Sequence, residues 1–361
     1  MLRALDRRDT LVMKAFAISA IVFHNYFHLI GNSVRENEFD FDAARFQRLL
    51  DVLPDPSFAI QGLFSFFGHF GVQVFIFLSA YGLAKNHWED SSNWHLFLWG
   101  RIQKLYPVFG LIVVPWFVMY LVVVGPMKGL PTGLYLLCMG MGISSLLPGL
   151  ELPPVGPWWF IPFILQFYAL WPFLCRFSKR FGQMGLLLAG VLSMIIVHLG
   201  NSQLAHLSIN LLETPAGHLP ELCLGVIAAR YHTHPRTRLV ILSGTVLLLG
   251  SEFRAFWPFT FTAALVVFIV VYFKFRTILR DSKMLQTIGR YSLLIFLLNG
   301  FSRFFFLPYA TTPRLELSLA LISGLTCFTV AVFIQSFALP PFVRRRMNAV
   351  PEVGRHIQSL G

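Results

Sequence analysis

An apolar stretch near the N-terminus, SAIVFHNYFHLI at residues 19–30, carries His24, Asn25 and His28. An ionisable side chain at the centre of a bilayer costs roughly 2.5–3.5 kcal/mol on insertion scales, so these residues indicate a cavity and not a lipid-facing surface. His24 and His28 are one helical turn apart and share a face. Imidazole has an ordinary pKa of about 6.5, which suits it to take a proton from a hydroxyl near neutral pH. We take His24 as a candidate general base, with hydrogen bonding to neighbouring helices as the structural alternative.

Polar side chains recur in four later apolar segments, FGHFGVQVFIFLSAYGL, GPWWFIPFILQFY, HLPELCLG and YSLLIFLLNGF. At a similar depth in the outer half of a helix bundle, they are expected to meet in one polar pocket. Alternatively, the tryptophans lie in the interfacial aromatic belt. The alternative for His218 and Glu221 is that they only hydrogen-bond to each other. The predicted pocket comprises Asn25, His28, His69, Gln73, Trp159, Gln166, His218, Glu221 and Asn299.

Basic residues mark the inner ends of two of the expected helices. Lys14 precedes His24 by ten residues, about 15 Å along a helix at 1.5 Å per residue. RIQKLYP places Arg101 and Lys104 three residues apart, on one helical face at the start of the third span. Paired cations at the mouth of a groove suit the phosphates of a nucleotide-bearing ligand such as coenzyme A. The alternative is an ordinary positive-inside topology anchor.

Metal and disulfide chemistry are not expected. The four cysteines, at 138, 175, 223 and 327, stand singly in apolar segments without a CxxC pair. His232 and His234 lie in a basic loop without a cysteine or carboxylate partner, so they do not form a recognisable zinc pattern. We therefore expect no bound metal or cofactor.

The composition indicates a polytopic membrane protein. Of the 361 residues, 56% are hydrophobic and only 13% are charged, too apolar for a soluble domain of this length. The net charge of +12 is divided among short clusters between apolar runs. That distribution fits anionic lipid and topology signals and excludes a basic nucleic-acid-binding domain.

Apolar runs of near-bilayer length predict a transmembrane all-α bundle of about ten spans. With the arginine-rich N-terminus in the cytoplasm, the other basic loops and the C-terminus also fall inside, provided that residues 130–148 do not cross. An eleventh span is the alternative. The expected spans are 11–30, 62–84, 105–124, 157–177, 182–200, 216–231, 238–254, 256–273, 285–305 and 315–338.

Two segments are expected outside the bilayer. Residues 31–61 form the longest polar region and are predicted to make a small outer cap. Residues 125–156 are predicted to be an outer or re-entrant segment, because irregular backbone is tolerated at membrane depth only when protein covers it. No internal repeat or linker interrupts the chain, so residues 1–361 are interpreted as a single domain.

Six segments in order resemble the acyltransferase type 3 family of integral-membrane acyltransferases. These are the basic residue and histidine of the first span, GVQVFIFLSAYGL, RIQKLYP, WWFIPFILQFYALWP, HLPELCLG and IGRYSLLIFLLNG. The resemblance implies a ten-helix enzyme that moves an acyl group, usually acetyl, from cytoplasmic acyl-CoA to a carbohydrate hydroxyl at the outer face. It further implies His24 as the first-helix histidine, Lys14 as its basic partner, and Arg101 with Lys104 as the basic pair before Tyr-Pro.

The chain departs from the family pattern at several positions. Gln73, Gln166 and Asn299 stand where the family often has Asp, Glu and His, and Ser79-Ala80 replaces the usual Ser-Gly. An amide keeps hydrogen-bonding reach but loses charge and basicity. Any acid that assists His24 must then come from elsewhere, and Glu221 or an outer-loop acid is the first candidate.

The sequence predicts a membrane O-acetyltransferase of a bacterial cytoplasmic membrane, acting on a cell-surface glycan or lipid-linked sugar. Its expected partners are acyl-CoA, a carbohydrate acceptor and membrane lipid, and its oligomeric state stays open. The competing hypothesis is a transporter or flippase that binds a polar substrate in the pocket and releases it unchanged. The lack of repeated halves with interrupted helices argues against a transporter.

Overall fold

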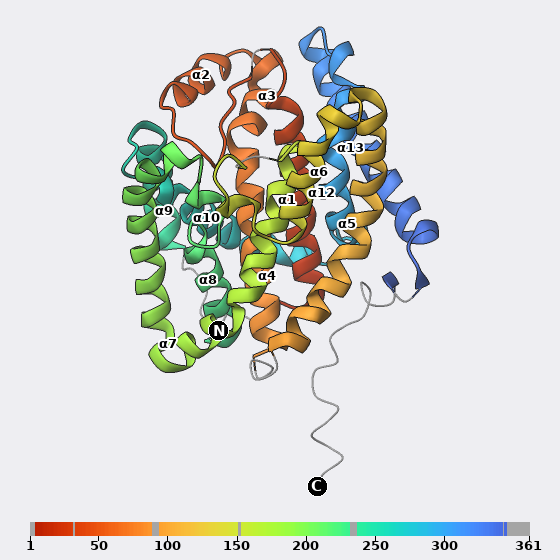
Figure 1. Cartoon of the computed structure of the whole chain (residues 1–361). Coiled ribbons are helices and arrows are strands. Elements are labelled where there is room, and N and C mark those ends of the chain that lie inside the picture. The colour runs from red at the N-terminus through yellow and green to blue at the C-terminus, as the bar shows by residue number, and fades with distance from the viewer. Residues whose placement is uncertain are drawn as a thin grey trace.

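The computed structural model describes residues 4–31, 33–88, 94–150, 153–231, 237–341 and 343–344. Within these ranges the regular elements are all helices, and no strand occurs. The predicted all-α class is therefore confirmed. Figure 1 shows the helices side by side in a bundle, with the N-terminus at one end and α2 at the other. We call these the N-terminal end and the cap end.

Helix α1 (Arg7–Phe27) is the central element of the bundle. The side chain of Asp6 accepts from the backbone N–H groups of Arg8 and Asp9, and the side chain of Asp9 accepts from the Asp6 N–H in return. This capping box satisfies N–H groups that the first turn leaves without helical partners. Helices α3, α4, α11, α12 and α13 all pack against α1. The helix runs from the N-terminal end to the cap end, and the HNYFH sequence therefore lies at the cap end (Figure 1).

The second membrane segment is longer than expected. Helix α3 (Pro56–Phe67), the short η1 (Gly68–Phe70) and α4 (Gly71–Asn86) form one candidate span over Pro56–Asn86. Asp55 caps α3 by accepting from the Ser57 N–H, so the helix begins six residues before the predicted boundary at 62. The last part of the predicted 31–61 cap is thus the start of this helix. Helix α2 (Ala44–Val52) lies in the remaining part of the cap.

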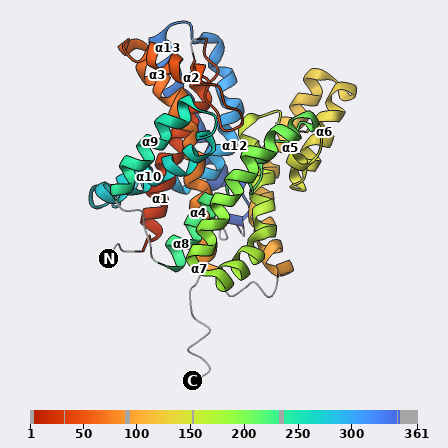
Figure 2. The same cartoon turned by 90° about the vertical axis from the view of Figure 1, so that its left-hand side faces the viewer.

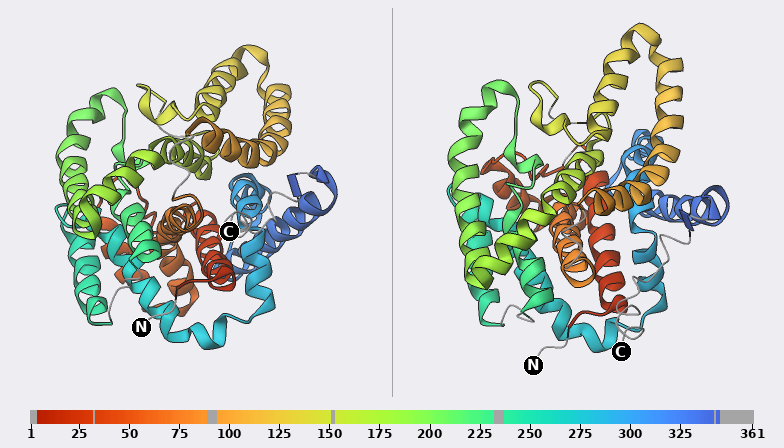
Figure 3. Two further views of the ribbon diagram at one scale, coloured as in Figure 1. Left: turned by 90° about the horizontal axis from the view of Figure 1, so that it is seen from below. Right: turned by 60° about the horizontal axis from the view of Figure 1, so that its bottom comes forward.

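Helices α5 (Trp94–Val124) and α6 (Pro126–Gly140) form a hairpin around Gly125, whose φ is +82°. At 1.5 Å per residue, α6 is about 22 Å long, less than the roughly 30 Å of hydrocarbon that a span crosses. Figure 3 shows this hairpin projecting from the bundle. Figure 2 shows the hairpin on one side of the bundle, with α9 (Arg238–Glu252) and α10 (Trp257–Leu279) on the other.

Helix α7 (Phe160–Leu204) contains a sharp reversal. Gly182 has a φ of +64° and a ψ of −160°, a conformation that is open to glycine and disfavoured for other residues. Figure 1 shows the chain turning there at the N-terminal end of the bundle. The break falls between the two predicted spans 157–177 and 182–200. Helix α8 (Leu219–Arg230) packs between α7 and α4.

The predicted span 285–305 is divided in two. Helix α11 (Lys283–Arg290) ends at Tyr291, and α12 (Ser292–Ser302) follows directly. Figure 3 shows the α11 segment lying across the N-terminal end of the bundle. A Cβ atom at Gly289 would lie 1.8 Å from the carbonyl oxygen of Leu11, so α11 and α1 are in backbone contact. Helix α13 (Pro313–Phe333) completes the bundle beside α12.

In the part of the chain that the structure describes, six helical segments are long and apolar enough to cross a membrane. A bent pair, Ser292–Gly300 with Arg303–Tyr309, would make a seventh. The count of ten spans and the cytoplasmic termini therefore stay predictions. Residues 232–236 and 345–361, which include His232, His234 and the C-terminus, lie outside the described ranges. The six segments are Arg7–Phe27, Pro56–Asn86, Trp94–Val124, Gly156–Leu207, Trp257–Leu279 and Pro313–Ala338.

A buried ion pair joins the first helix to α10. Asp9 is fully buried, and its Oδ1 accepts from the Tyr272 hydroxyl and the Arg276 Nε, each at 2.8 Å. Its other oxygen accepts from the Arg276 Nη2. Breaking one side of such a buried pair is strongly destabilising, because it leaves a charge without compensation. Asp9 therefore fixes α1 against α10 at the N-terminal end.

Candidate active site

A cavity of about 260 Å³ lies where the cap end of α1 meets η1, η4 (Gly156–Trp159) and residues 33–43, which we call the cap loop. Its wall is formed by segments far apart in sequence. The cavity therefore needs both the helix bundle and the cap. The polar residues that line it are His24, Asn25, His28, Asn37, Glu38, Asp40, His69, Trp159 and Arg303.

Three histidines form one side of this cavity. The ring centroid of His24 lies 5.2 Å from that of His28 and 5.5 Å from that of His69. A Cβ atom at Gly68 would lie 2.6 Å from the His24 Cβ, so the missing side chain lets η1 approach α1 closely. This close approach brings His69 to the first helix. The structure thus brings together three of the four histidines that the sequence assigns to one pocket, and His218 is the exception.

The hydrogen bond of His24 selects its basic nitrogen. His24 Nδ1 lies 3.2 Å from the carbonyl oxygen of Phe64. A carbonyl oxygen only accepts, so Nδ1 carries the proton in this contact and Nε2 keeps the free lone pair. His24 is 6% exposed and lines the cavity. It is therefore held in the tautomer that a general base needs.

A chain of hydrogen bonds attaches α12 to this end of α1. Asn25 Nδ2 donates to Asn299 Oδ1 at 2.8 Å, and Asn299 Nδ2 donates to the Phe296 carbonyl at 2.6 Å. Arg303 Nη1 donates to the carbonyl of Asn25 at 2.7 Å. Asn299 is not among the lining residues, so it acts on the site through Asn25.

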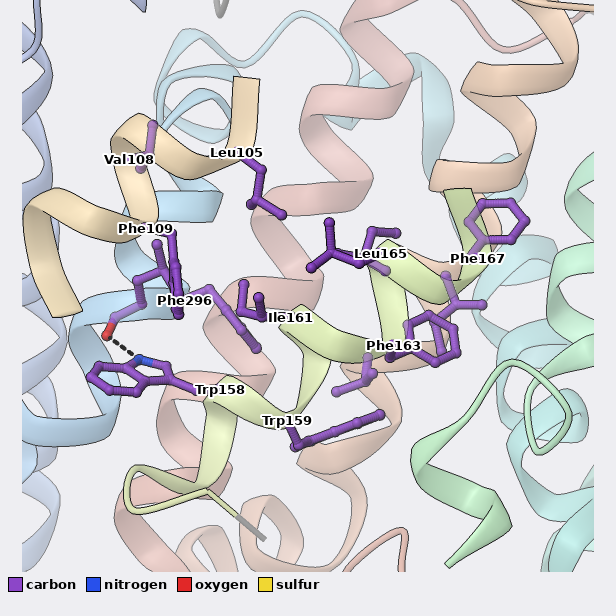
Figure 4. Packing of buried hydrophobic residues seen from close by; sticks show 14 of the residues in the cluster. Leu105, Val108, Phe109, Trp158, Trp159, Ile161, Phe163, Leu165, Phe167 and Phe296 are labelled. Atoms are coloured by element: carbon purple, nitrogen blue, oxygen red, sulfur yellow. Dashed lines mark hydrogen bonds between the residues drawn. The ribbon is translucent and has the colours of Figure 1, made fainter. Parts of the chain in front are cut away.

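Trp159 separates the cavity from the pair formed by His218 and Glu221. One part of its indole lines the cavity, and its ring also stacks on His218 with centroids 5.9 Å apart. Figure 4 shows Trp159 beside the aromatic core and Trp158 donating to a backbone carbonyl, that of Leu297 at 3.1 Å. The two tryptophans thus anchor η4 and hold this wall in place.

His218 and Glu221 lie behind that wall. His218 Nε2 donates to the Leu212 carbonyl at 2.9 Å, and its Nδ1 is 3.8 Å from Glu221 Oε2. Thr262 donates a hydrogen bond to Glu221 Oε1. Both side chains are fully buried, and neither is among the residues that line the cavity. The two side chains are therefore neighbours, but His218 Nδ1 and Glu221 Oε2 have no hydrogen-bond partner within the described residues, so the hydrogen-bonded pair that was the structural alternative is not found.

The two glutamines of the predicted pocket also lie away from the cavity wall. Gln166 Nε2 donates to the Gly142 carbonyl and to Ser145 Oγ, each at 2.8 Å, and so fixes the turn after α6. Gln73 is fully buried, and neither its Oε1 nor its Nε2 has a hydrogen-bond partner within the described residues. Similar depth in the bundle therefore did not bring every predicted side chain to one surface.

The basic residues assigned to the donor lie toward the other end. Helix α4 reaches the N-terminal end, where Lys85 donates to the Leu5 carbonyl at 2.9 Å, and α5 starts shortly afterwards. The guanidinium of Arg101 stacks on Phe97, 5.2 Å from the ring centroid. Figure 1 shows this start of α5 on the side of the N-terminus. The residues Lys14, Arg101 and Lys104 do not line the cavity.

Four polar lining residues, Asn37, Glu38, Asp40 and Arg303, were not named individually from the sequence, and Glu38 and Arg303 bear on the chemistry. Glu38 belongs to the cap loop, is 6% exposed, and has a pKa that burial raises to about 7. It lies in the segment that the sequence predicts to be outside, where an acid was sought to replace the missing family acids. Arg303 follows the NGFS sequence at the end of α12, and an arginine inside an apolar segment was the available signal.

Metal binding finds no support among the described residues, where no group of three or more His, Cys, Asp or Glu side chains could hold an ion. The four cysteines are free and buried. The cavity instead combines an oriented imidazole, a carboxyl group, a guanidinium and an indole face. Such a set can bind a polar molecule and remove a proton from it.

Comparison with known proteins covers nearly the entire chain. A family model described as an acyltransferase domain matches residues 11–339. The matched range includes all the residues that line the cavity. In the comparisons with curated proteins and with solved structures, nothing matched.

Proposed function

Because the chain belongs to the acyltransferase type 3 family of membrane acyltransferases, we propose that it transfers an acetyl group from acetyl-CoA to a sugar hydroxyl in the cavity. The acceptor is a cell-surface glycan or its lipid-linked precursor, and the membrane is the bacterial cytoplasmic membrane. The observation that carries the proposal is the His24 contact with the Phe64 carbonyl, which leaves Nε2 as a base beside the cavity.

In the proposed reaction, Nε2 of His24 takes the proton of the acceptor hydroxyl as its oxygen attacks the thioester carbonyl. A tetrahedral intermediate forms, and its collapse breaks the carbon–sulfur bond. The sulfur leaves as a thiolate and takes the proton back from the imidazolium. An ester and free coenzyme A are the products, and the histidine returns to its starting state. The chemistry needs no metal or redox partner for its balance.

The donor is proposed to enter from the N-terminal end of the bundle. Lys14, Arg101 and Lys104 supply positive charge there, which suits the phosphates of coenzyme A. The acetyl thioester must then extend along α1 toward His24, about 15 Å beyond Lys14 at 1.5 Å per residue. A flexible pantetheine arm suits that distance better than a compact donor.

Glu38 is proposed to replace the acid that the amides at 73 and 166 no longer provide. It lines the same cavity as His24 and comes from the cap loop. A carboxyl group there can accept a hydrogen bond from a sugar hydroxyl and orient it toward the base. Glu221 is a weaker candidate because it does not line the cavity.

Radiolabelled acetyl-CoA provides the direct test. Purified protein in lipid nanodiscs is incubated with the labelled donor and a panel of lipid-linked sugars and soluble glycans, and products are separated by chromatography. We expect label in an alkali-labile ester on an acceptor, and about 10²- to 10⁴-fold slower labelling with His24→Ala. Transport of an unlabelled sugar into vesicles without ester formation would support the flippase hypothesis instead.

A further inference from the structure

Arg303 brings a buried positive charge to the cavity. Arg303 is 8% exposed and belongs to η7 (Arg303–Phe305), directly after α12. Nη1 donates to the Asn25 carbonyl, while Nε is buried with no hydrogen-bond partner. Among the described residues, no carboxylate oxygen lies within 4.0 Å of this guanidinium. A buried charge is costly unless it is paired, so this site favours an anion from outside the chain.

The acidic residues of the cavity do not fully compensate this charge. Asp40 is engaged by Arg45, whose Nη2 lies 2.8 Å from Asp40 Oδ2 and whose Nη1 donates to the Asp40 carbonyl at 2.7 Å. Burial raises the pKa of Glu38 to about 7, so this carboxyl is only partly ionised near neutral pH and offsets the Arg303 charge only in part. The uncompensated charge of the cavity is therefore positive.

The position of Arg303 relates this charge to the reacting hydroxyl. It binds the carbonyl of Asn25, the residue after His24, and both arginine and histidine line one cavity of about 260 Å³. That volume is just below the roughly 300–1,000 Å³ of pockets for drug-sized ligands. It suits a single sugar ring, with the indole of Trp159 available to cover one face.

We propose that the acceptor sugar carries an anionic group, a carboxylate or a phosphate, and that Arg303 binds this group while His24 faces a neighbouring hydroxyl. This inference rests on the proposed function, because it names the class of acceptor for the same cavity. A guanidinium pairs with either anion through two parallel N–H donors, which fixes orientation as well as affinity. Arg303 is thus a specificity-determining residue.

Binding of small sugars tests the inference without turnover. Isothermal titration calorimetry on the full chain in nanodiscs compares methyl glucuronide, glucose 6-phosphate and neutral methyl glucoside. We expect the wild-type protein to bind at least one anionic sugar roughly 10- to 150-fold more tightly than the glucoside, as a charged hydrogen bond would give. The carboxylate and phosphate arms show which anion fits.

Two variants assign the preference to Arg303. Arg303→Gln should bind the three sugars with similar affinity, while the matched control Arg254→Gln, at an exposed arginine between α9 and α10, should keep the wild-type preference. Size-exclusion profile and coenzyme A binding confirm that each variant is folded. If Arg303→Gln does not fold, the test uses the wild-type protein and Arg303→Lys. Lysine keeps the positive charge, so Arg303→Lys should keep part of the preference for anionic sugars.

Three outcomes would overturn the inference. In the first, the wild-type protein does not distinguish charged from neutral sugars. In the second, Arg303→Gln keeps the full preference. In the third, Arg303→Gln lowers acetyl transfer equally to charged and neutral acceptors without changing their binding, which would assign Arg303 to the oxyanion of the intermediate. A different result separates the two proposals. If Arg303→Gln loses the preference for anionic sugars but the wild-type protein transfers no acetyl group, the proposed function is refuted and the anion site is supported.

Discussion

His24 combines a free basic nitrogen, a fixed ring and access to the cavity. General-base catalysis contributes about 10² to 10⁴ in rate, so His24→Ala should lower acetyl transfer by that order while donor binding and membrane insertion persist. His24→Asn should be equally impaired, because an amide imitates the hydrogen bond to Phe64 but cannot take a proton near pH 7. Near-normal turnover of His24→Asn in the radiolabel assay would reduce the histidine to a packing role.

Arg101 and Lys104 are assigned to the donor on charge and position. Replacing both by Gln should weaken coenzyme A binding by roughly 1.5–3 kcal/mol for each charged hydrogen bond lost. Equilibrium binding of coenzyme A to purified protein measures this. Arg176→Gln with Arg180→Gln is the matched control, since this pair is exposed near the same end, before the Gly182 turn. Equal affinity of the Arg101/Lys104 variant and wild type would leave the pair as a topology anchor.

At the residue scale, the sequence predicted how deep in the bundle some polar side chains lie. It did not predict toward which neighbour each helix turns them. Counting residues from the ends of the first two spans brought His24 and His69 to one level, and they do meet. The same reasoning grouped Gln166 and Glu221 with them, yet both face other neighbours. Helix rotation depends on packing against the partners, and an apolar segment with little amphipathic contrast does not encode it.

At the scale of elements, the cap should loosen as the pH rises. Burial raises the pKa of Glu36 and of Glu38 from 4.5 to about 7. Below pH 4.5 both groups are protonated whether the cap is closed or open. Between 4.5 and 7 the open state loses its protons first, so stability falls as pH rises, and above 7 the loss is complete. The upper bound is about 3 kcal/mol per group at 1.36 kcal/mol per pKa unit.

Hydrogen exchange measures this loosening. Protection factors of the α2 amides should be lower at pH 8 than at pH 5, and Glu36→Gln with Glu38→Gln should flatten the dependence. Asp51→Asn, at an exposed carboxylate of α2, is the control and should keep it. Protection that is the same at both pH values in the wild-type protein would contradict the role of these buried carboxyls.

The contact between α11 and α1 gives a second test at this scale. Because a Cβ atom at Gly289 would lie 1.8 Å from the Leu11 carbonyl oxygen, Gly289→Ala must displace backbone. Overpacking of this kind typically costs about 1–3 kcal/mol. Gly244→Ala in α9 meets no atom within 4 Å and should be neutral or slightly stabilising. Thermal melting of the purified variants compares them, and equal melting temperatures would show that the helices are not in this contact.

Element boundaries were predictable only where a local signal exists. Gly182 follows a basic cluster and marks the reversal in α7, which the sequence separated into two spans. The predicted 285–305 span was continuous because its residues are all compatible with one helix. Its division at Tyr291 depends on the contact of α11 with α1, and no local residue pattern reports such a tertiary contact.

For the whole molecule, alternation of the spans predicts which ends face the cytoplasm. The four native cysteines are buried, so single introduced cysteines report accessibility with little background. A membrane-impermeant maleimide added to intact cells should label Asp51→Cys and Lys128→Cys but not Lys283→Cys, all at exposed positions. After permeabilisation all three should react. Labelling of residue 283 from outside would reverse the assigned orientation.

The buried pair of Asp9 and Arg276 also constrains how the chain is made. The two residues are 267 positions apart. At a synthesis rate of about 5–20 residues per second, roughly 13–53 s pass between their emergence from the ribosome. During that time the carboxylate of Asp9 lacks the Arg276 guanidinium that binds it in the folded chain, so the contact that fixes α1 against α10 forms late in synthesis. We expect the N-terminal turn of this helix to stay in water or among lipid headgroups until the last third of the chain, which supplies Arg276, has been made.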